Sequence, residues 1–233
     1  MLLFLPFSAP AQQATEAQTP PVSLADLAGR ADLVVLAQAR DTDYFMRREI
    51  PVSGSAYLKV LIPYKSPDDA IQPGDIIDVY EKGLHEHECY FPNPTVFEEG
   101  RRYLLFLKKD PEDDERYRGM PEGCALDVLV DSNNRYALRY PVNGISLSDD
   151  LGPLATEMEF RDPYAIADDE SLLPAERDSM LKAGELVTYT AEESKAEGSS
   201  TRWAPGTEPK GLRWIYTRGV DLTAARKLMF TAP

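Results

Sequence analysis

The sequence has few of the residues on which catalysis and nucleic-acid binding depend. It contains two histidines and two cysteines, and its 25 Lys and Arg are outnumbered by 39 Asp and Glu, for a formal net charge of -14. The cations are scattered, with no run longer than a pair such as Arg47-Arg48 or Lys108-Lys109. Affinity for nucleic acids rests on cations that displace counterions from phosphates, so this composition disfavours a nucleic-acid partner.

Common catalytic motifs are missing as well. The chain has no Gly-x-Ser-x-Gly elbow, no Gly-x-Gly and no Gly-Lys-Ser/Thr, which are signatures of hydrolase nucleophiles and of phosphate-binding loops. A nucleophilic side chain needs a base beside it, and only His85 and His87 could be a histidine base. We therefore expect a protein that is not an enzyme and has no cofactor, with an unrecognised hydrolase as a remote alternative.

The first 22 residues have the composition of an export signal and a linker. A short apolar block, Leu2–Phe7, precedes Ala9–Ala11, which fits the small-x-small pattern before a cleavage site. No Lys or Arg precedes the block and it is short, so we expect the printed start to lie inside a longer signal. We predict a signal peptide over residues 1–11, a disordered leader over residues 12–22, and a periplasmic or secreted mature protein.

No other apolar run approaches the roughly 20 residues that a helix needs to span a bilayer. We therefore expect a mature protein without a membrane span.

From residue 23 onward, apolar runs alternate with turn signals. The continuous apolar run at residues 33–37 predicts a buried strand, and residues 103–107, apolar on both faces, predict a central one. Period-two alternation over residues 56–62 predicts a strand with one apolar face, and residues 131–134 predict a hairpin turn. We predict a mainly β fold with a few helices, in which residues 23–147 form an OB-like small β-barrel.

An acidic loop, residues 110–115, follows the predicted central strand. It lacks the glycine that a tight calcium loop needs, so we interpret it as a solvated hairpin tip rather than a calcium site.

The remaining third, residues 148–233, is predicted to be a helical and irregular C-terminal extension packed on the barrel. Helices are predicted at residues 174–183 and 221–229. Trp203, Trp214 and Tyr216 lie here among basic residues, a combination common at binding surfaces. The same aromatic side chains would also dock the extension on the barrel, and we favour docking over a binding surface.

The order of several segments resembles a known family. These segments are Ser23–Leu27, Ala31–Leu36, Leu58–Val60, Gln72–Asp75 and Phe97–Leu107. Over residues 23–140 the chain resembles bacterial exported proteins whose barrel is similar to the netrin-like, OB-fold module of the tissue inhibitors of metalloproteinases. The most specific part is Glu99–Leu107, Glu-Gly-Arg-Arg-Tyr-Leu-Leu-Phe-Leu. The resemblance implies a fold rather than an activity.

The eukaryotic inhibitors of that family chelate a protease zinc through an N-terminal cysteine. The present chain has no cysteine before Cys89. The resemblance therefore does not carry that inhibitory mechanism over to this chain.

Two interpretations compete for the segment around the histidines. On an extended segment His85, His87 and Cys89 project to one side, where two imidazoles and a thiolate could bind zinc or copper. Alternatively, Cys89 forms a disulfide with Cys124, because an exported protein meets an oxidising environment. A bridged sulfur is no thiolate ligand, so the two exclude each other, and we favour the disulfide.

We therefore expect a non-enzymatic exported binding module whose partner is a protein or peptide of the envelope. The alternative function is a metal-binding envelope protein that uses His85, His87 and Cys89.

Overall fold

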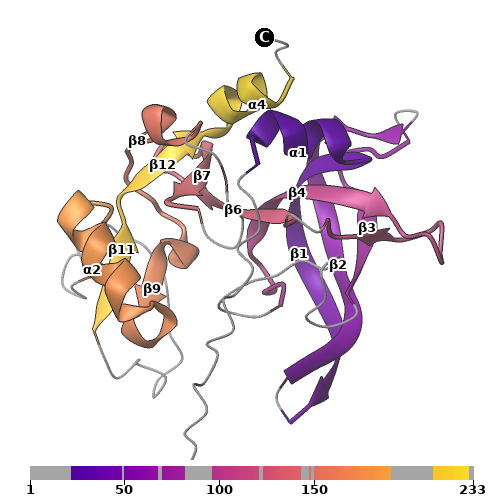
Figure 1. Ribbon diagram of the computed structural model, residues 1–233, viewed down its shortest axis with the longest axis horizontal. Helices are drawn as coiled ribbons and strands as arrows, with labels where there is room; N and C mark the ends of the chain where they lie inside the picture. The colour runs from indigo at the N-terminus through magenta and orange to yellow at the C-terminus, as the bar shows by residue number, and fades with distance from the viewer. Residues whose placement is uncertain are drawn as a thin grey trace, which may run out of the picture.

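The computed structural model of the chain describes residues 22–48, 50–67, 70–81, 96–120, 123–142, 147, 150–189 and 212–230. The fold is mainly β with a few helices, as predicted (Figure 1). The first part consists of α1 (Leu24–Arg30), β1 (Leu33–Arg47), β2 (Ile50–Lys65), β3 (Ile76–Glu81), β4 (Arg102–Lys109), β5 (Tyr117–Arg118), β6 (Ala125–Val130) and β7 (Tyr136–Tyr140). The second part consists of η2 (Gly152–Leu154), β8 (Thr156–Glu157), η3 (Pro163–Ala165), β9 (Ile166–Asp168), η4 (Asp169–Ser171), α2 (Pro174–Ala183), β10 (Leu186–Thr188), β11 (Arg213–Tyr216), β12 (Arg218–Asp221) and α4 (Leu222–Phe230).

The large sheet curls so that its first strands close into a ring. β1 pairs antiparallel with β2 along one edge and with β4 along the other, and β2 pairs with β3. The ring is completed by β5, which contacts β3 in parallel and β4 antiparallel. The order β1-β2-β3-β5-β4 thus returns to β1, which makes the small barrel that the sequence predicts.

Both faces of β1 and β4 are buried, which explains their continuous apolar sequences. Leu33 and Val35 of β1 pack with Leu105 of β4 in an interior cluster inside the ring. Val34 and Phe106 point the other way and pack under α1 and α4. Successive side chains of a strand point to opposite faces, so a strand that is covered on both sides needs apolar residues at every position.

Helix α1 begins at a capping box and covers the outer face of β1 and β4. The Ser23 side chain accepts a hydrogen bond from the backbone N–H of Asp26, and the Asp26 carboxylate accepts one from the N–H of Ser23. Its buried face, which includes Leu24 and Leu27, packs beside α4 from the far end of the chain (Figure 1).

The second part of the chain adds two strands to the large sheet and builds a smaller sheet of its own. β12 pairs antiparallel with β7 and β8, and the smaller sheet has the order β10-β11-β9. A third apolar cluster joins the parts, because Leu129 and Ala137 of the large sheet pack with Trp214 and Tyr216 of β11.

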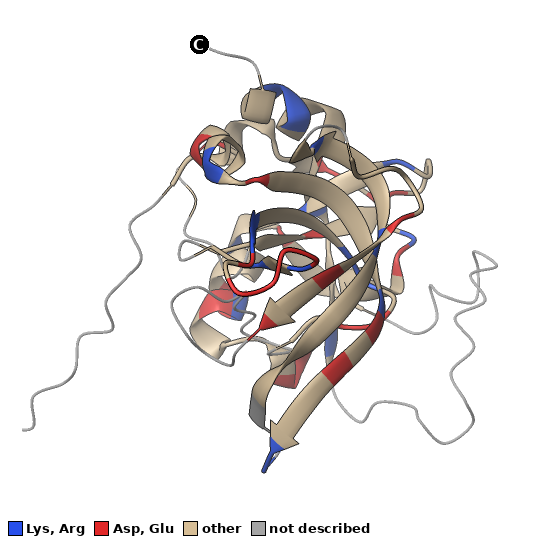
Figure 2. Ribbon diagram, turned by 90° about the vertical axis from the view of Figure 1, so that its right-hand side faces the viewer, with Lys and Arg blue, Asp and Glu red and all other residues tan. Residues whose placement is uncertain are grey.

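The β1–β2 hairpin extends well beyond the ring. β4 pairs with β1 only as far as Gln38, and β3 pairs with β2 only from Gly54 onward. Residues 40–48 and 50–53 form a two-stranded projection, here called the arm (Figures 1 and 2).

No helix among the residues described above is long and apolar enough to cross a membrane.

Candidate functional site

Several of the residues singled out from the sequence lie outside the described residues. These are His85, His87, Cys89 and Trp203. The metal site and the disulfide therefore stay predictions, although Cys124 is placed, with 1% of its surface exposed, in the interior cluster of the barrel. Within the described part of the chain, no group of three or more His, Cys, Asp or Glu side chains could hold a metal ion.

Trp214 and Tyr216 do not form a binding surface, which corrects that alternative for both residues. They are 8% and 2% exposed, respectively, because alternate positions of β11 face the third apolar cluster. The Trp214 indole N–H donates to Asp169 at 2.8 Å, and the Tyr216 ring lies under the Arg139 guanidinium, 4.6 Å from its centroid. Side chains that are buried and partnered in this way pack the extension on the sheet.

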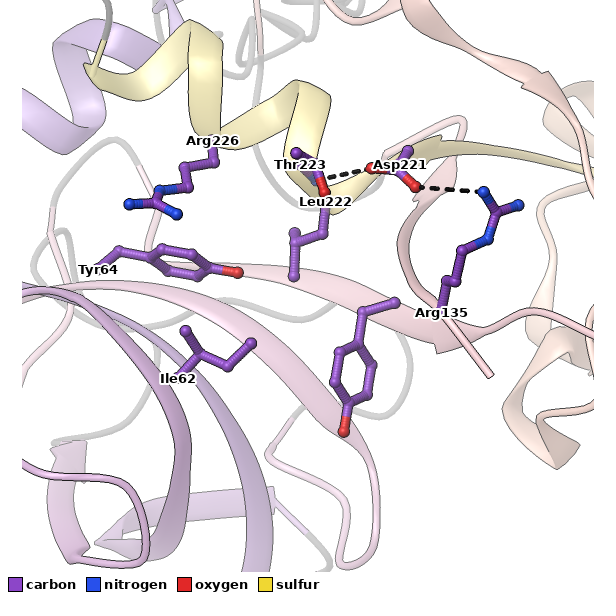
Figure 3. Close-up of a pocket in the computed structure, with 8 residues that line it drawn as sticks. Ile62, Tyr64, Arg135, Asp221, Leu222, Thr223 and Arg226 are labelled. Atoms are coloured by element: carbon purple, nitrogen blue, oxygen red, sulfur yellow. Dashed lines mark hydrogen bonds and ion pairs between the residues drawn. The ribbon is translucent and has the colours of Figure 1, made fainter. Parts of the chain in front are cut away.

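A groove of about 240 Å³ lies where α4 meets the barrel, here called the seam groove (Figure 3). It forms because β2, the β6–β7 hairpin and the start of α4 come together from distant parts of the chain. Its lining residues are Ile62, Tyr64, Arg135, Tyr136, Asp221, Leu222, Thr223 and Arg226.

One side of the seam groove is organised by Asp221 at the start of α4. One carboxylate oxygen accepts a hydrogen bond from the backbone N–H of Thr223 at 2.8 Å. The other lies 3.9 Å from a guanidinium nitrogen of Arg135 (Figure 3). The carboxylate thus caps the helix, while Arg135 at the rim is held mainly by Asp131, 2.8 Å from its guanidinium.

The other side of the seam groove presents the guanidinium of Arg226. Among the described residues, Arg226 has no hydrogen bond or ion pair, and its side chain points toward the Tyr64 ring (Figure 3). Burial raises the pKa of Tyr64 to about 12 against the opposing effect of Arg226, so its hydroxyl remains a hydrogen-bond donor at neutral pH. Ile62, which is 36% exposed, adds apolar surface beside them.

This combination suits a ligand that has an apolar body and one anionic group. A guanidinium offers paired N–H donors that match a carboxylate, and aromatic and aliphatic side chains bury the rest. Sites for drug-sized molecules measure roughly 300–1,000 Å³, so the groove is smaller than a typical site of that kind and suits a small group or the end of a chain.

The sequence does not predict this groove. The helix at residues 221–229 is expected from its pattern, but the position of Arg226 against Tyr64 depends on how two distant segments pack. The only local signal is the mixture of Arg and apolar residues on that helix, which is also typical of an ordinary surface helix.

A second hollow, of about 690 Å³, lies at the C-terminal end of α1 and is lined by Arg30, Lys65, Lys108 and Lys109 among others. Its lysines are already engaged. The Lys65 ammonium donates to the carbonyls of residues 28, 29 and 31, which closes the end of the helix. Lys108 pairs with Asp32 at 2.9 Å, and Lys109 donates to the carbonyl of residue 114. These contacts give the three lysines a structural role.

Two buried carboxylates also form ion pairs inside the fold. The Asp110 side chain is 0% exposed and pairs with Arg116 at 3.0 Å and Arg118 at 2.9 Å, so the start of the acidic loop is not the solvated tip expected from the sequence. Asp162, from the extension, pairs with Arg102 of β4 at 2.9 Å. Burial raises the pKa of Asp162 despite this contact.

Comparison of the chain with protein-family models, with curated proteins and with solved structures finds no match. No relative therefore transfers an activity, and function is inferred from the seam groove and its surroundings.

Proposed function

We propose that this chain is a non-enzymatic, exported binding module whose partner is a protein or peptide of the cell envelope, received at the seam groove. The observation that carries the proposal is Arg226, a guanidinium without an internal partner among the described residues, beside Tyr64 and the exposed Ile62. Arg and Tyr are among the residues that contribute most to protein interfaces. The resemblance to netrin-like barrels fits a binding role.

The ligand group that this site fits is the carboxyl end of a peptide. A terminal carboxylate would pair with Arg226, and its apolar side chain would lie over Ile62 and Leu222. The chain carries a formal net charge of -14, which repels acidic partners at long range. A neutral or basic peptide with a free carboxyl terminus satisfies both the overall field and the local guanidinium.

The test is binding of short peptides that have either a free or an amidated carboxyl terminus, measured by fluorescence anisotropy. Free peptides with an apolar last residue should bind, and amidation or Arg226→Glu should weaken them about tenfold or more. Arg161→Glu is the matched control, because this arginine is exposed and lies outside the groove. Equal binding by free and amidated peptides, or by wild type and Arg226→Glu, would contradict the proposed site.

Export is tested separately, by N-terminal sequencing of the protein taken from its native host. A mature chain that begins close to Gln12 is expected, because small residues precede that position. Recovery of chains with an intact Met1 in the cytosolic fraction would refute the export part of the proposal.

A further inference from the structure

The seam groove carries charges of opposite sign at its two ends. Asp221 lies directly before the first residue of α4, and Arg226 follows five residues later on the same helix. Figure 3 shows the two side chains at opposite ends of the groove, with Leu222 and the Tyr64 hydroxyl between them. Both charges act on that hydroxyl, because Arg226 lowers the pKa of Tyr64 and Asp221 raises it.

The acidic end keeps a negative charge that its neighbours do not neutralise. Arg135, the other charged residue among the described lining residues, is committed to Asp131, to which two of its nitrogens lie at 2.9 and 2.8 Å. Its distance to Asp221, 3.9 Å, is longer than a hydrogen bond. Asp131 and Arg135 therefore cancel each other, and the charge of Asp221 remains.

The Asp221 carboxylate also has an oxygen available to a ligand. One oxygen accepts the hydrogen bond that caps α4, and the second accepts none from the described residues. The side chain is 34% exposed, so a cationic group can reach it from solvent. A carboxylate in this state forms a charge-assisted hydrogen bond with a lysine or an arginine.

The distance between the two ends corresponds to two residues of an extended peptide. An α-helix rises about 1.5 Å per residue, so Arg226 lies about 7.5 Å along the axis from Asp221. An extended chain advances about 3.3 Å per residue, and every second side chain points to the same side. With its terminal carboxylate at Arg226 and its last side chain over Ile62 and Leu222, such a peptide brings its third-from-last side chain to Asp221.

We infer that the seam groove recognises peptides whose last residue is apolar, with a free carboxylate, and whose third residue from the end is lysine or arginine. Asp221 is the residue that selects the basic side chain. This specificity rests on the proposed function, because Arg226 has to hold the carboxylate for the register to be fixed. A basic peptide also suits a chain with a formal net charge of -14.

The experiment compares two peptides of the same composition, both ending in leucine with a free carboxylate. One has a single lysine at the third position from the end, and the other has that lysine at the penultimate position, where the side chain points away from Asp221. Fluorescence anisotropy should show that the wild type binds the first about two- to fivefold more tightly, as expected for a partly exposed ion pair. The preference should shrink as salt is added.

Two variants then assign the preference to one carboxylate. Asp221→Asn keeps a side-chain oxygen that can cap α4 but removes the charge, so this variant should bind the two peptides equally. Asp178→Asn makes the same change at a carboxylate that is 68% exposed and outside the groove, and it should retain the preference.

Amidation of both peptides separates this specificity from the proposed site itself. If amidation weakens binding but the wild type does not distinguish the two lysine positions, or if Asp221→Asn retains the preference, the inferred role of Asp221 is wrong and the carboxylate site stands. If amidation has no effect on either peptide, the proposed site is wrong and the inferred specificity falls with it. The comparison of peptides on the wild type does not depend on the folding of any variant.

Discussion

The inner and outer halves of the β1–β2 hairpin contrast sharply although they belong to the same two strands. In the inner half, Leu33 to Ala37 are fully buried, with strand partners on both edges of β1 and apolar clusters on both faces. In the outer half, β1 pairs only with β2 within the described ranges, and Phe45 is 66% exposed. The difference shows that the neighbours of a strand segment decide its burial, even within one continuous strand.

The boundary between the halves is built into the backbone. Gly54 lies opposite Tyr44 on β1 and Glu81 on β3, at the last position where the hairpin belongs to the ring. A Cβ atom at Gly54 would overlap the Asp43 carbonyl oxygen and the Tyr44 backbone. The Tyr44 hydroxyl donates to the buried Glu81 carboxylate at 2.6 Å, and burial together with that carboxylate raises the pKa of Tyr44 far above its usual range. The root of the arm is therefore tightly held while its tip is not.

The largest effect is expected inside the ring. Leu105 is fully buried and lies opposite Val35 of the inner half. Leu105→Ala should lower the free energy of unfolding by about 2–5 kcal/mol, through lost burial and the cavity left behind. Chemical denaturation measures this, and a loss below about 1 kcal/mol, typical of surface positions, would show that the strand is not central.

A second prediction concerns the loop after β4. Like the arm, this loop leaves the ring, but the ion pairs of Asp110 hold it in place. Asp110→Asn should cost about 1.5–3 kcal/mol at pH 7, because the buried carboxylate bonds two guanidiniums. Asp113→Asn is the control, since that carboxylate also contacts Arg116 but is 41% exposed. Equal costs for the two variants would contradict the anchoring role.

The same carboxylate predicts a dependence on pH. Burial favours a higher pKa for Asp110, but the hydrogen bond from the Glu112 N–H and the nearby arginines Arg118 and Arg116 hold the pKa below its usual range. Its stabilisation is therefore present above the unfolded value of about 3.9 and is lost as the pH falls through the lower folded value. The difference between wild type and Asp110→Asn should shrink below about pH 4, and a difference that grew in acid would reverse the assigned direction.

A third prediction tests the boundary at Gly54. Gly54→Ala should destabilise the protein by about 1–3 kcal/mol, because the added methyl group forces the two strands of the hairpin apart. Gly29→Ala adds the same group near the end of α1, where no atom lies within 4 Å, and should be neutral or slightly stabilising. Thermal unfolding of both variants compares them, and an unchanged midpoint for Gly54→Ala would show that the strands tolerate separation.

The smallest effect is expected at the outer half. Phe45→Ala should change the free energy of unfolding by less than about 1 kcal/mol, because the Phe45 side chain is largely exposed. A loss as large as that of Leu105→Ala would mean that the arm is part of the core.

Much of the secondary structure follows from local signals in the sequence. The apolar run at residues 33–37 and the one at 103–107 are buried strands, as predicted. The helix predicted at 174–183 spans those residues and ends at Gly184, which adopts a left-handed conformation. The turn at residues 131–134 is closed by the Asp131 carboxylate, which accepts hydrogen bonds from the backbone of Asn133 and Arg135. Periodicity, capping and turn chemistry act over a few residues and can be read directly.

The arm and the anchored loop depend on longer-range contacts. Alternation over residues 56–62 predicts a strand, but β2 begins earlier, at Ile50. Nothing in the pattern of β2 predicts that its pairing with β3 starts only at Gly54. The acidic loop suggests a solvated tip, yet Asp110 is buried because Arg116 and Arg118 fold back on it. An acidic residue in a polar stretch carries no local sign that two arginines will neutralise it.

The amino-acid sequence thus determined the class of fold, the strands of the barrel and the helices of the extension, because these depend on patterns within short segments. Tertiary structure alone decided where Arg226 lies relative to Tyr64 and which side of β1 has no neighbour among the described residues. Those outcomes require segments from opposite ends of the chain to meet, and the alternation of a single strand does not specify what will cover it.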